Sequence, residues 1–277
     1  RFSDDGEWHA ITLNLGDPRS SSGHVDLGAV ESLQLSVAAS SDAEVVVHVN
    51  GLATTPRPAR GTVTIMFDDA RESVYHLGLP VLDALDMPAT VSVIADLAAV
   101  PGFMTVSQLR ELQDAYGWEV VAHHRTPLTA ERSFVVLTPD ELIAELAGVR
   151  AWMLDNGLTS GIDAISYPHG GIDAPAQAIV RRYFDSGRTV VRGVGLETFP
   201  PADPLRLRAY VVRDNDPVAD LLDLVDRAEA SGGWLILVFH QLTIDAPVFQ
   251  TAYRLDDFTT VMEHVAASRL AIVPLSR

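Results

Sequence analysis

The sequence predicts an α/β protein, namely a distorted parallel (β/α) barrel of about seven units preceded by a small all-β segment. From residue 61 onward, short apolar runs alternate with longer segments of helical periodicity, the pattern of parallel strands joined by crossover helices. The 277 residues are also 47% hydrophobic, with a mean hydropathy of +0.15. This is enough apolar material to bury a sizeable core.

The first 58 residues have a different pattern. Apolar residues recur with a period near two at 10–15, 33–37 and 44–50, separated by Gly, Asp, Ser and Pro, which predicts three short strands. Because three strands do not close a sandwich, we expect either the tail of a larger β-sandwich or a small sheet packed on the next domain. The stretch 56–61 predicts a stiff linker. We therefore expect an accessory segment at 1–58 and the barrel at 59–277.

Within the barrel the elements follow in order. Apolar runs predict strands at 62–67, 89–94, 118–122, 164–167, 189–192, 206–212, 234–239 and 271–275. Amphipathic periodicity predicts helices at 106–116, 138–156, 174–186, 218–231 and 255–267. Ser107 is the candidate N-cap of the first helix, and proline in the first turn opens the second.

Composition excludes several classes of protein. A net charge of -17, from 37 acidic and 20 basic residues, would repel a phosphate backbone, so we expect no nucleic-acid partner. Every basic residue is arginine, which excludes a P-loop or Schiff-base lysine. No cysteine is present, so thiolate nucleophiles, disulfides and zinc ribbons are absent. No apolar run approaches the roughly 20 residues of a membrane span, and the chain starts without the features of a signal peptide.

Reactive side chains follow four of the predicted strands. These are Asp68 and Asp69 after 62–67, His123 and His124 after 118–122, His169 after 164–167, and His240 after 234–239. Each alone is best explained as a loop carboxylate or a satisfied histidine. Because catalysis in parallel barrels takes place at the carboxyl ends of the strands, their common position predicts one shared site.

At these residues the sequence resembles the polysaccharide deacetylase family, the metal-dependent carbohydrate esterases with NodB homology. Residues 64–70 are similar to the family's first motif, with Met66 and Ala70 in place of threonine and glycine. Residues 117–123 resemble the approach to the second motif, 167–170 the third and 237–240 the last. The likeness extends over residues 61–277, with the motifs in the family's order.

The resemblance implies a role for each site residue. Asp68 would be the general base, Asp69 a metal ligand with His123 and His124 as candidate imidazole ligands, and His240 the general acid. The cofactor would be a divalent metal, expected to be zinc, that lowers the pKa of its water to about 7. The remaining residues implied in binding the oxyanion or the substrate are Tyr167, Pro168, His169, Gly170 and Phe239, the last in the pocket for the acyl methyl group.

The sequence also departs from the family pattern. The second motif requires a histidine four residues after the first, but Pro127 stands four after His123 and Leu128 four after His124. One imidazole is therefore missing unless His124 or His169 replaces it, and neighbours on a strand point apart unless the strand bends. Ser166 occupies a position where many members have arginine, and the fourth motif, Asp-x-x-Asp-Trp, has no counterpart. Arg192 and Arg208 either orient Asp68 or form surface salt bridges.

The expected function is the metal-dependent removal of acetyl groups from an N- or O-acetylated cell-surface polysaccharide by an extracellular, cell-surface or virion-associated enzyme. The β segment would attach the barrel to a larger surface or virion complex, since the arrangement resembles modular bacterial and phage tail proteins. Two alternatives remain. One is a carbohydrate-binding protein that lost its metal through Pro127. The other is a metal-free glycan hydrolase that pairs Asp68 with Glu197.

Overall fold

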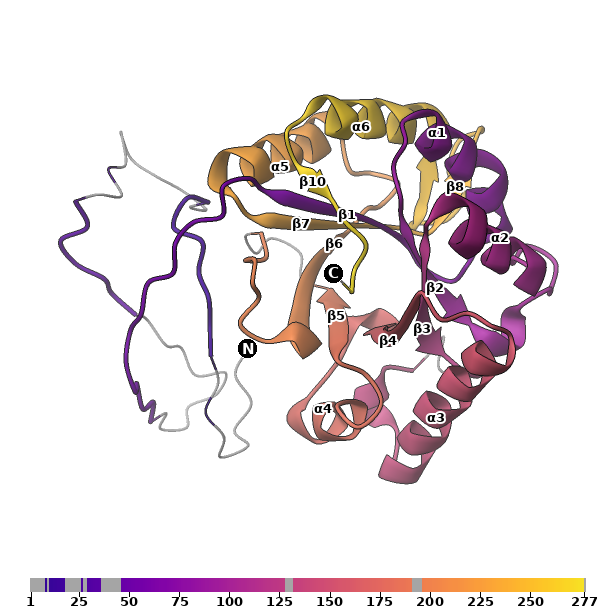
Figure 1. Ribbon diagram of the computed structural model, residues 1–277, viewed down its shortest axis with the longest axis horizontal. Coiled ribbons are helices and arrows are strands. Elements are labelled where there is room, and N and C mark those ends of the chain that lie inside the picture. The colour runs from indigo at the N-terminus through magenta and orange to yellow at the C-terminus, as the bar shows by residue number, and fades with distance from the viewer. Residues whose placement is uncertain are drawn as a thin grey trace.

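The computed structural model describes residues 8, 10–17, 26, 29–35, 46–127, 132–190 and 196–276. Among these residues seven parallel strands close into a barrel, which confirms the predicted fold (Figure 1). They pair in sequence order, and the last pairs back to the first. The strands are β1 (Thr62–Phe67), β2 (Thr90–Ile94), β3 (Glu119–His124), β4 (Gly161–Ser166), β5 (Ser186–Val190), β6 (Leu207–Val211) and β7 (Trp234–Phe239).

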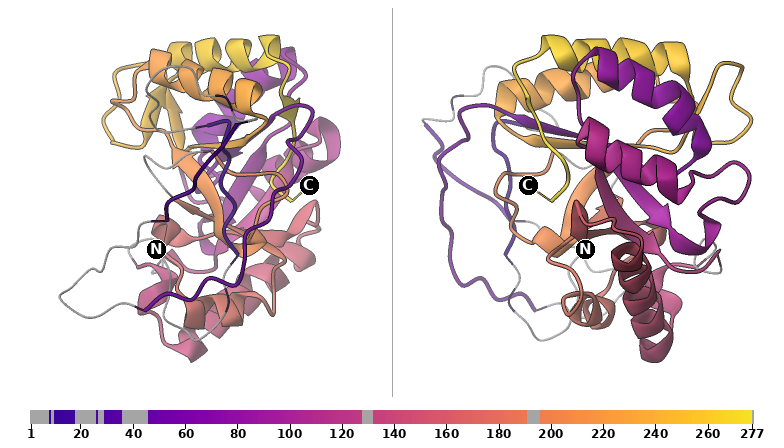
Figure 2. Two further views of the ribbon diagram at one scale, coloured as in Figure 1. Left: turned by 90° about the vertical axis from the view of Figure 1, so that its left-hand side faces the viewer. Right: turned by 45° about the vertical axis from the view of Figure 1, so that its right-hand side comes forward.

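Helices cover much of the outer surface of the barrel (Figure 2). They are α1 (Leu79–Ala84) after a π-helical turn at Val74–Gly78, α2 (Val106–Tyr116), α3 (Pro139–Asp155), α4 (Ala174–Val180), α5 (Val218–Ser231) and α6 (Leu255–Ala267). The bounds of α2, α5 and α6 agree with the sequence prediction, whereas α4 ends at Val180 instead of 186. The sequence does not predict α1, because Gly78 and Pro80 suggest a break in helical structure. In the protein Pro80 lies in the first turn of α1, where proline is favoured. It also misses the short strands β8 (Gln241–Thr243) and β9 (Ala252–Arg254).

The N-cap of α2 is Thr105 and not Ser107. Thr105 Oγ1 accepts a hydrogen bond from Gln108 N at 3.2 Å, and Gln108 Oε1 accepts one from Thr105 N at 2.8 Å. This reciprocal pair is a capping box, which satisfies two backbone N–H groups at the start of the helix. Thr138 and Glu141 make the same pair at the predicted start of α3.

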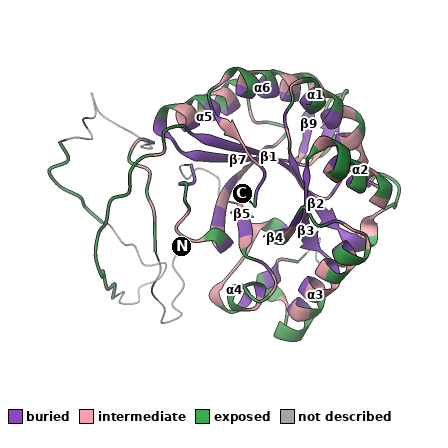
Figure 3. Cartoon of the chain, in the orientation of Figure 1, coloured by how far each residue is buried: buried purple, intermediate pink, exposed green. Residues whose placement is uncertain are grey.

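Figure 3 shows that the strands of the barrel are largely buried. Their side chains alternate between two cores. On β7, Trp234, Ile236 and Val238 belong to the cluster inside the barrel, while Leu235 and Phe239 belong to the larger cluster under the helices. By the same alternation, side chains at Met66, Ala164 and Val121 face inward. The inward positions are every second residue along each strand. Where this series continues past the end of a strand, a polar residue therefore lies over the carboxyl end of the barrel.

The C-terminal segment closes the amino end of the barrel. β10 (Ala271–Ile272) pairs with the first residues of β1, whereas β2 pairs only with its last two. Beyond β10, Leu275 N donates to Thr90 Oγ1 at 3.1 Å and Ser276 N to Glu119 Oε2 at 3.1 Å. Leu275 is buried in the inner cluster. Since this segment fills the space between β1 and β2 at the amino end, the open end is the carboxyl one.

The predicted β segment is not seen as strands. The described residues within 10–15, 33–37 and 44–50 carry no strand, and Ile11 and Leu13 are 55% and 63% exposed. An alternating apolar pattern forms a strand only where a second strand pairs with it through hydrogen bonds. The described residues of this segment contain no such second strand. The segment does contact the barrel, because Asp17 Oδ1 lies 2.7 Å from Arg227 Nη2. The β-sandwich and the domain boundary at residue 58 stay predictions.

None of the helices in the described part of the chain has the length and apolar character needed to cross a bilayer.

Candidate active site

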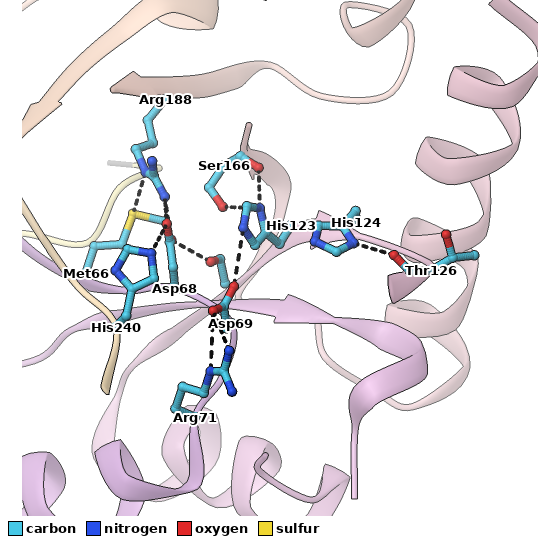
Figure 4. A network of polar contacts seen from close by, with 11 residues as sticks. Met66, Asp68, Asp69, Arg71, His123, His124, Thr126, Ser166, Arg188 and His240 are labelled. Carbon is cyan, nitrogen blue, oxygen red and sulfur yellow. Dashed lines mark hydrogen bonds and ion pairs between the residues drawn. The ribbon is translucent and has the colours of Figure 1, made fainter. Parts of the chain in front are cut away.

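Asp68 and His240 lie side by side at the carboxyl end of the barrel (Figure 4). β1 and β7 are in register with Phe67 opposite Phe239, and Asp68 N donates to Phe239 O at 2.9 Å. The next residue on each strand points inward, so His240 Nε2 lies 3.7 Å from Asp68 Oδ2. The predicted base and the predicted acid therefore meet.

Two side chains from different strands fix the buried carboxylate of Asp68. Arg188 Nη2, from β5, contacts both of its oxygens, and Ser92 Oγ, from β2, donates to Oδ1 at 2.8 Å. Burial alone would raise the pKa of Asp68. The charges of Arg188, His123 and His240 outweigh this and hold the pKa well below its usual range. Asp68 is therefore ionised and acts as a hydrogen-bond acceptor at neutral pH.

His240 makes fewer hydrogen bonds than Asp68. Its Nδ1 is buried and has no hydrogen-bond partner among the described residues. Burial lowers the pKa of His240, although Asp68 and Asp69 act in the opposite direction. The resting ring is therefore neutral near pH 7. A proton on Nδ1 would be a buried N–H without an acceptor, so the proton lies on Nε2, facing Asp68.

Asp69 and His123 form a second pair. Asp69 and Ala70 both have positive φ, 68° and 51°, and this turn follows directly on β1. Asp69 Oδ1 lies 3.7 Å from His123 Nε2, while Oδ2 accepts a hydrogen bond from Arg71 Nη2 at 3.2 Å. His123 Nδ1 donates to the carbonyl of Ser166 at 2.8 Å. In the neutral ring, the lone pair of Nε2 then faces Asp69, as in a histidine that ligates a metal.

A bulge places His124 next to His123. The register between β2 and β3 shifts after Val93, so that His124 and not His123 pairs with Ile94. The two imidazole rings consequently lie 4.7 Å apart, although neighbours on a regular strand point to opposite faces. His124 Nδ1 donates to Thr126 O at 2.7 Å. Burial, with a contribution from His123, lowers the pKa of His124 to about 3.

These residues make an incomplete metal site. Asp69 Oδ1 and His123 Nε2 suit a divalent metal in chemistry and orientation. In the described part of the chain, however, no group of three or more His, Cys, Asp or Glu residues could hold an ion. Pro127, at the position of the missing imidazole, has no ligand atom, and His124 Nδ1 is committed to Thr126. The donors described here therefore do not fit a three-residue zinc site.

The third-motif loop is shaped by packing. Tyr167 is buried and its hydroxyl donates to Leu205 O at 2.8 Å, so the hydroxyl serves the fold. Burial raises the pKa of Tyr167. Pro168 is buried, while His169, with φ 56°, is exposed at the rim. Gly170 has φ 72°, and any β-carbon there would overlap the backbone nitrogen of Val190. Only glycine therefore fits at this position.

Other predicted site residues lie elsewhere. Phe239 has no exposed surface and packs against Phe67, Tyr253 and Phe258 under the helices, so it does not line the barrel mouth. Its outward position follows from strand alternation, since the next residue, His240, points inward. Arg192 lies outside the described residues.

Arg208 does not contact Asp68 but forms an ion pair with Glu197, Nη2 to Oε1 at 2.8 Å. Glu197 is bridged to Trp234, the first residue of β7, whereas Asp68 lies level with the end of that strand. Six residues of strand separate the two levels, about 20 Å at 3.3 Å per residue. An acid/base pair for glycoside hydrolysis requires carboxylates about 5–9.5 Å apart. The predicted pairing of Asp68 with Glu197 is therefore wrong.

Sequence reasoning misses three residues of the site, namely Arg188, Ser92 and Arg71. The first two lie inside strands, Ser92 in β2 (TVSVI) and Arg188 in β5 (SGRTV), so a search of the positions just after each strand does not find them. The predicted strand at 189–192 begins one residue too late to include Arg188.

Comparisons with known proteins find deacetylases among the chains that this one is similar to. Residues 55–183 match the family model for polysaccharide deacetylases. The chain is similar to a deacetylase from Streptococcus pyogenes solved in complex with acetate, with 24% identity over 60% of this chain and 71% of that one and a TM-score of 0.52. It is similar to a family 4 carbohydrate esterase from Streptomyces lividans, also in complex with acetate, with 16% identity, 75% and 86% coverage and a TM-score of 0.50.

A polysaccharide deacetylase from Bacillus cereus matches 53% of this chain with 21% identity and a TM-score of 0.43. The match covers 46% of that protein, so this chain spans less than half of its length. No curated protein matches the chain. At these identities the solved structures establish the fold.

Proposed function

Because the chain belongs to the polysaccharide deacetylase family through residues 55–183, we propose that it removes acetyl groups from an N- or O-acetylated polysaccharide. The observation that carries the proposal is the convergence of Asp68 and His240 at the open end of the barrel, 3.7 Å apart, beside the pair Asp69 and His123. These four side chains come from the ends of three strands, which is where parallel barrels place their chemistry.

The geometry supports hydrolysis with separate proton acceptor and donor. Asp68 is ionised and can accept the proton of an attacking water. His240 becomes the acid toward a departing amine or alkoxide once its unpaired Nδ1 has taken up a proton, because the imidazolium and not the neutral ring gives up a proton near pH 7. A positioned acid or base of this kind contributes about 10²–10⁴-fold to a rate.

Metal dependence is a separate part of the proposal. A divalent metal, when bound by family members, supplies an activated water and polarises the acyl carbonyl. Among the residues that the structure describes, only Asp69 and His123 offer donors with the required orientation, and Arg71 already binds the same carboxylate. We propose that any zinc binds through these two side chains and is held less tightly than in a three-donor site.

The substrate follows from the family and from charge. With a net charge of -17, the chain favours a neutral or basic glycan over a polyanionic one. Such polysaccharides occur at cell surfaces, so we propose an extracellular or cell-surface site of action. Association with a virion or a larger surface complex through residues 1–58 is part of the same proposal, supported by the alternating apolar pattern there.

A second candidate is a carbohydrate-binding protein without catalysis. Pro127, in place of a metal-ligating histidine, favours this candidate, because unactivated water attacks an acetamide slowly.

The deciding experiment measures acetate released from acetylated chitin, xylan and peptidoglycan fragments, with added zinc and with chelator. Asp68→Asn and His240→Ala should each abolish release while glycan binding persists. Binding without acetate release by the wild-type protein would establish the second candidate.

A further inference from the structure

The loop between β8 and β9, residues 244–251, carries the most exposed apolar side chains of the barrel. Among the described residues from 59 onward, no other large apolar side chain is as exposed as Val248 (81%), Ile244 (68%) and Phe249 (60%). Figure 2 shows this loop, in gold, projecting from the body of the protein. Single exposed apolar residues are common, but several gathered in one place mark an interaction site.

The loop is tied to the barrel mouth at both of its ends. β8 begins directly after His240. At the other end of the loop, Gln250 O accepts a hydrogen bond at 3.0 Å from Asp214 N, in the segment that follows β6. Val211, the last residue of β6, is level with Val238 of β7, so Asp214 lies beyond the level of His240. The exposed apolar side chains therefore stand at the rim of the candidate active site.

Hydrogen bonds fix the backbone around Phe249. Ala252 N donates to Phe249 O at 2.9 Å, and β8 and β9 pair with Leu242 opposite Tyr253, both of them buried. A phenylalanine ring has only two side-chain torsions. Because its backbone is already held, the ring loses little conformational entropy when a ligand covers it.

The chemistry of this rim fits a sugar ring. The face of a phenyl ring carries partial negative charge and attracts the C–H groups on the apolar face of a pyranose. Asp214, Asn215 and Gln250 are exposed in the same two segments and offer carboxylate and amide groups to sugar hydroxyls. A membrane surface fits less well, because the exposed carboxylates of Asp214 and Asp245 would be repelled by anionic headgroups.

We propose that Phe249 is a specificity-determining residue that stacks on a sugar ring next to the acetylated one, so that residues 244–251 select extended glycan chains over short ones. Ile244 and Val248 enlarge the apolar surface on which the chain lies. The inference rests on the proposed function, since it requires the glycan to enter the barrel mouth. Phe249 contributes to binding, and the proton transfers of Asp68 and His240 do not depend on it.

The test compares short and long ligands. The Kd for oligomers of N-acetylglucosamine and of acetylated xylose, with two and with six units, is measured by titration calorimetry, together with kcat and KM for acetate release. Phe249→Ala removes the ring, and Phe249→Trp keeps an aromatic face. Leu154→Ala is the matched control, because Leu154 is also exposed (52%) but lies at the end of α3, which leads to the amino end of the barrel.

We expect Phe249→Ala to weaken binding of the six-unit ligand by about tenfold, the size of one aromatic contact, and binding of the two-unit ligand by less than twofold. KM for the long substrate should rise in parallel while kcat stays constant. Phe249→Trp should behave like the wild-type protein, and Leu154→Ala should change neither affinity. The inference is overturned if Phe249→Ala binds the long ligand as the wild type does, or loses equally for both lengths.

A failure of the proposed function would be distinguishable. If the wild-type protein binds the oligomers with this dependence on Phe249 but releases no acetate, the function is refuted and the role of Phe249 stands. If it releases acetate and Phe249→Ala changes neither affinity nor KM, the function stands and the inference falls. A wild-type protein that neither binds the oligomers nor releases acetate overturns both. Binding to phosphatidylcholine vesicles that Phe249→Ala abolishes, with oligomer affinities unchanged, would overturn the inference in favour of a membrane contact.

Discussion

Glu145 of α3 binds Thr126, two residues after the histidine pair of β3. Its Oε1 accepts from Thr126 Oγ1 at 2.6 Å, and its Oε2 accepts from Thr126 N at 3.0 Å and from Arg125 N at 2.8 Å. The carbonyl of Thr126 in turn accepts from His124 Nδ1. One helix carboxylate therefore fixes the turn that begins where the histidines end, and a helix that touches no substrate helps to shape the site.

Replacing Glu145 should loosen this turn. Glu145→Ala leaves two part-buried backbone N–H groups and a hydroxyl without their acceptor, so we expect a loss of about 2–3 kcal/mol in the free energy of unfolding. Chemical denaturation measures this loss. Glu229→Ala is the control, because its ion pair with Arg269 is on the surface and should contribute much less to stability. Equal effects of the two substitutions would contradict a structural role for Glu145.

The folded protein should lose stability in weak acid because of His124. Its pKa is lowered to about 3 in the folded state, against about 6.5 when unfolded, so below pH 6.5 the unfolded chain binds a proton that the folded chain does not. Stability is complete above pH 6.5 and falls as the pH drops toward 3. At pH 5 the loss is about 2 kcal/mol.

Denaturation curves between pH 7.5 and 5 measure this dependence, and His124→Asn is the informative variant. Its side-chain amide can still donate to Thr126 O but cannot titrate. We expect a shallower fall with pH in the variant, with the remaining slope due partly to His240, whose pKa is also lowered by burial. An unchanged slope would show that His124 is not the group responsible.

Much of this fold follows from the sequence, because the strands of a parallel barrel are nearly continuous apolar runs and the helices carry caps and amphipathic faces. Asp68, Asp69, His123 and His240 were predictable for the same reason, since each directly follows such a run. Arg188 was not predictable, because it lies inside a strand. A charged residue interrupts the apolar pattern, so the predicted strand starts after it, at residue 189. The bulge at His123 was also hidden, since register depends on pairing between distant segments.

The N-terminal residues should be held to the barrel by Asp17. Its side chain is buried between Arg227, 2.7 Å from Oδ1, and the backbone N–H of Leu196, which donates to Oδ2 at 3.0 Å. Asp17→Ala leaves that buried N–H unpaired, at a cost of about 1–3 kcal/mol. We expect faster proteolytic removal of the residues before the linker, with an intact barrel fragment. Glu31→Ala serves as an exposed control, and equal cleavage rates would place the attachment elsewhere.

Metal binding should respond to the residue at position 127. Pro127→His introduces an imidazole four residues after His123, the spacing of the family's second motif, and would give Asp69 and His123 a third donor. We expect the affinity for zinc, measured by titration calorimetry, to rise by at least tenfold over the wild-type protein. His123→Ala in the Pro127→His background should cancel the gain, because the new imidazole would again have a single well-oriented partner. If Pro127→His leaves the affinity for zinc unchanged, the turn held by Glu145 does not direct residue 127 toward Asp69. More than one substitution would then be needed to make a three-donor metal centre here.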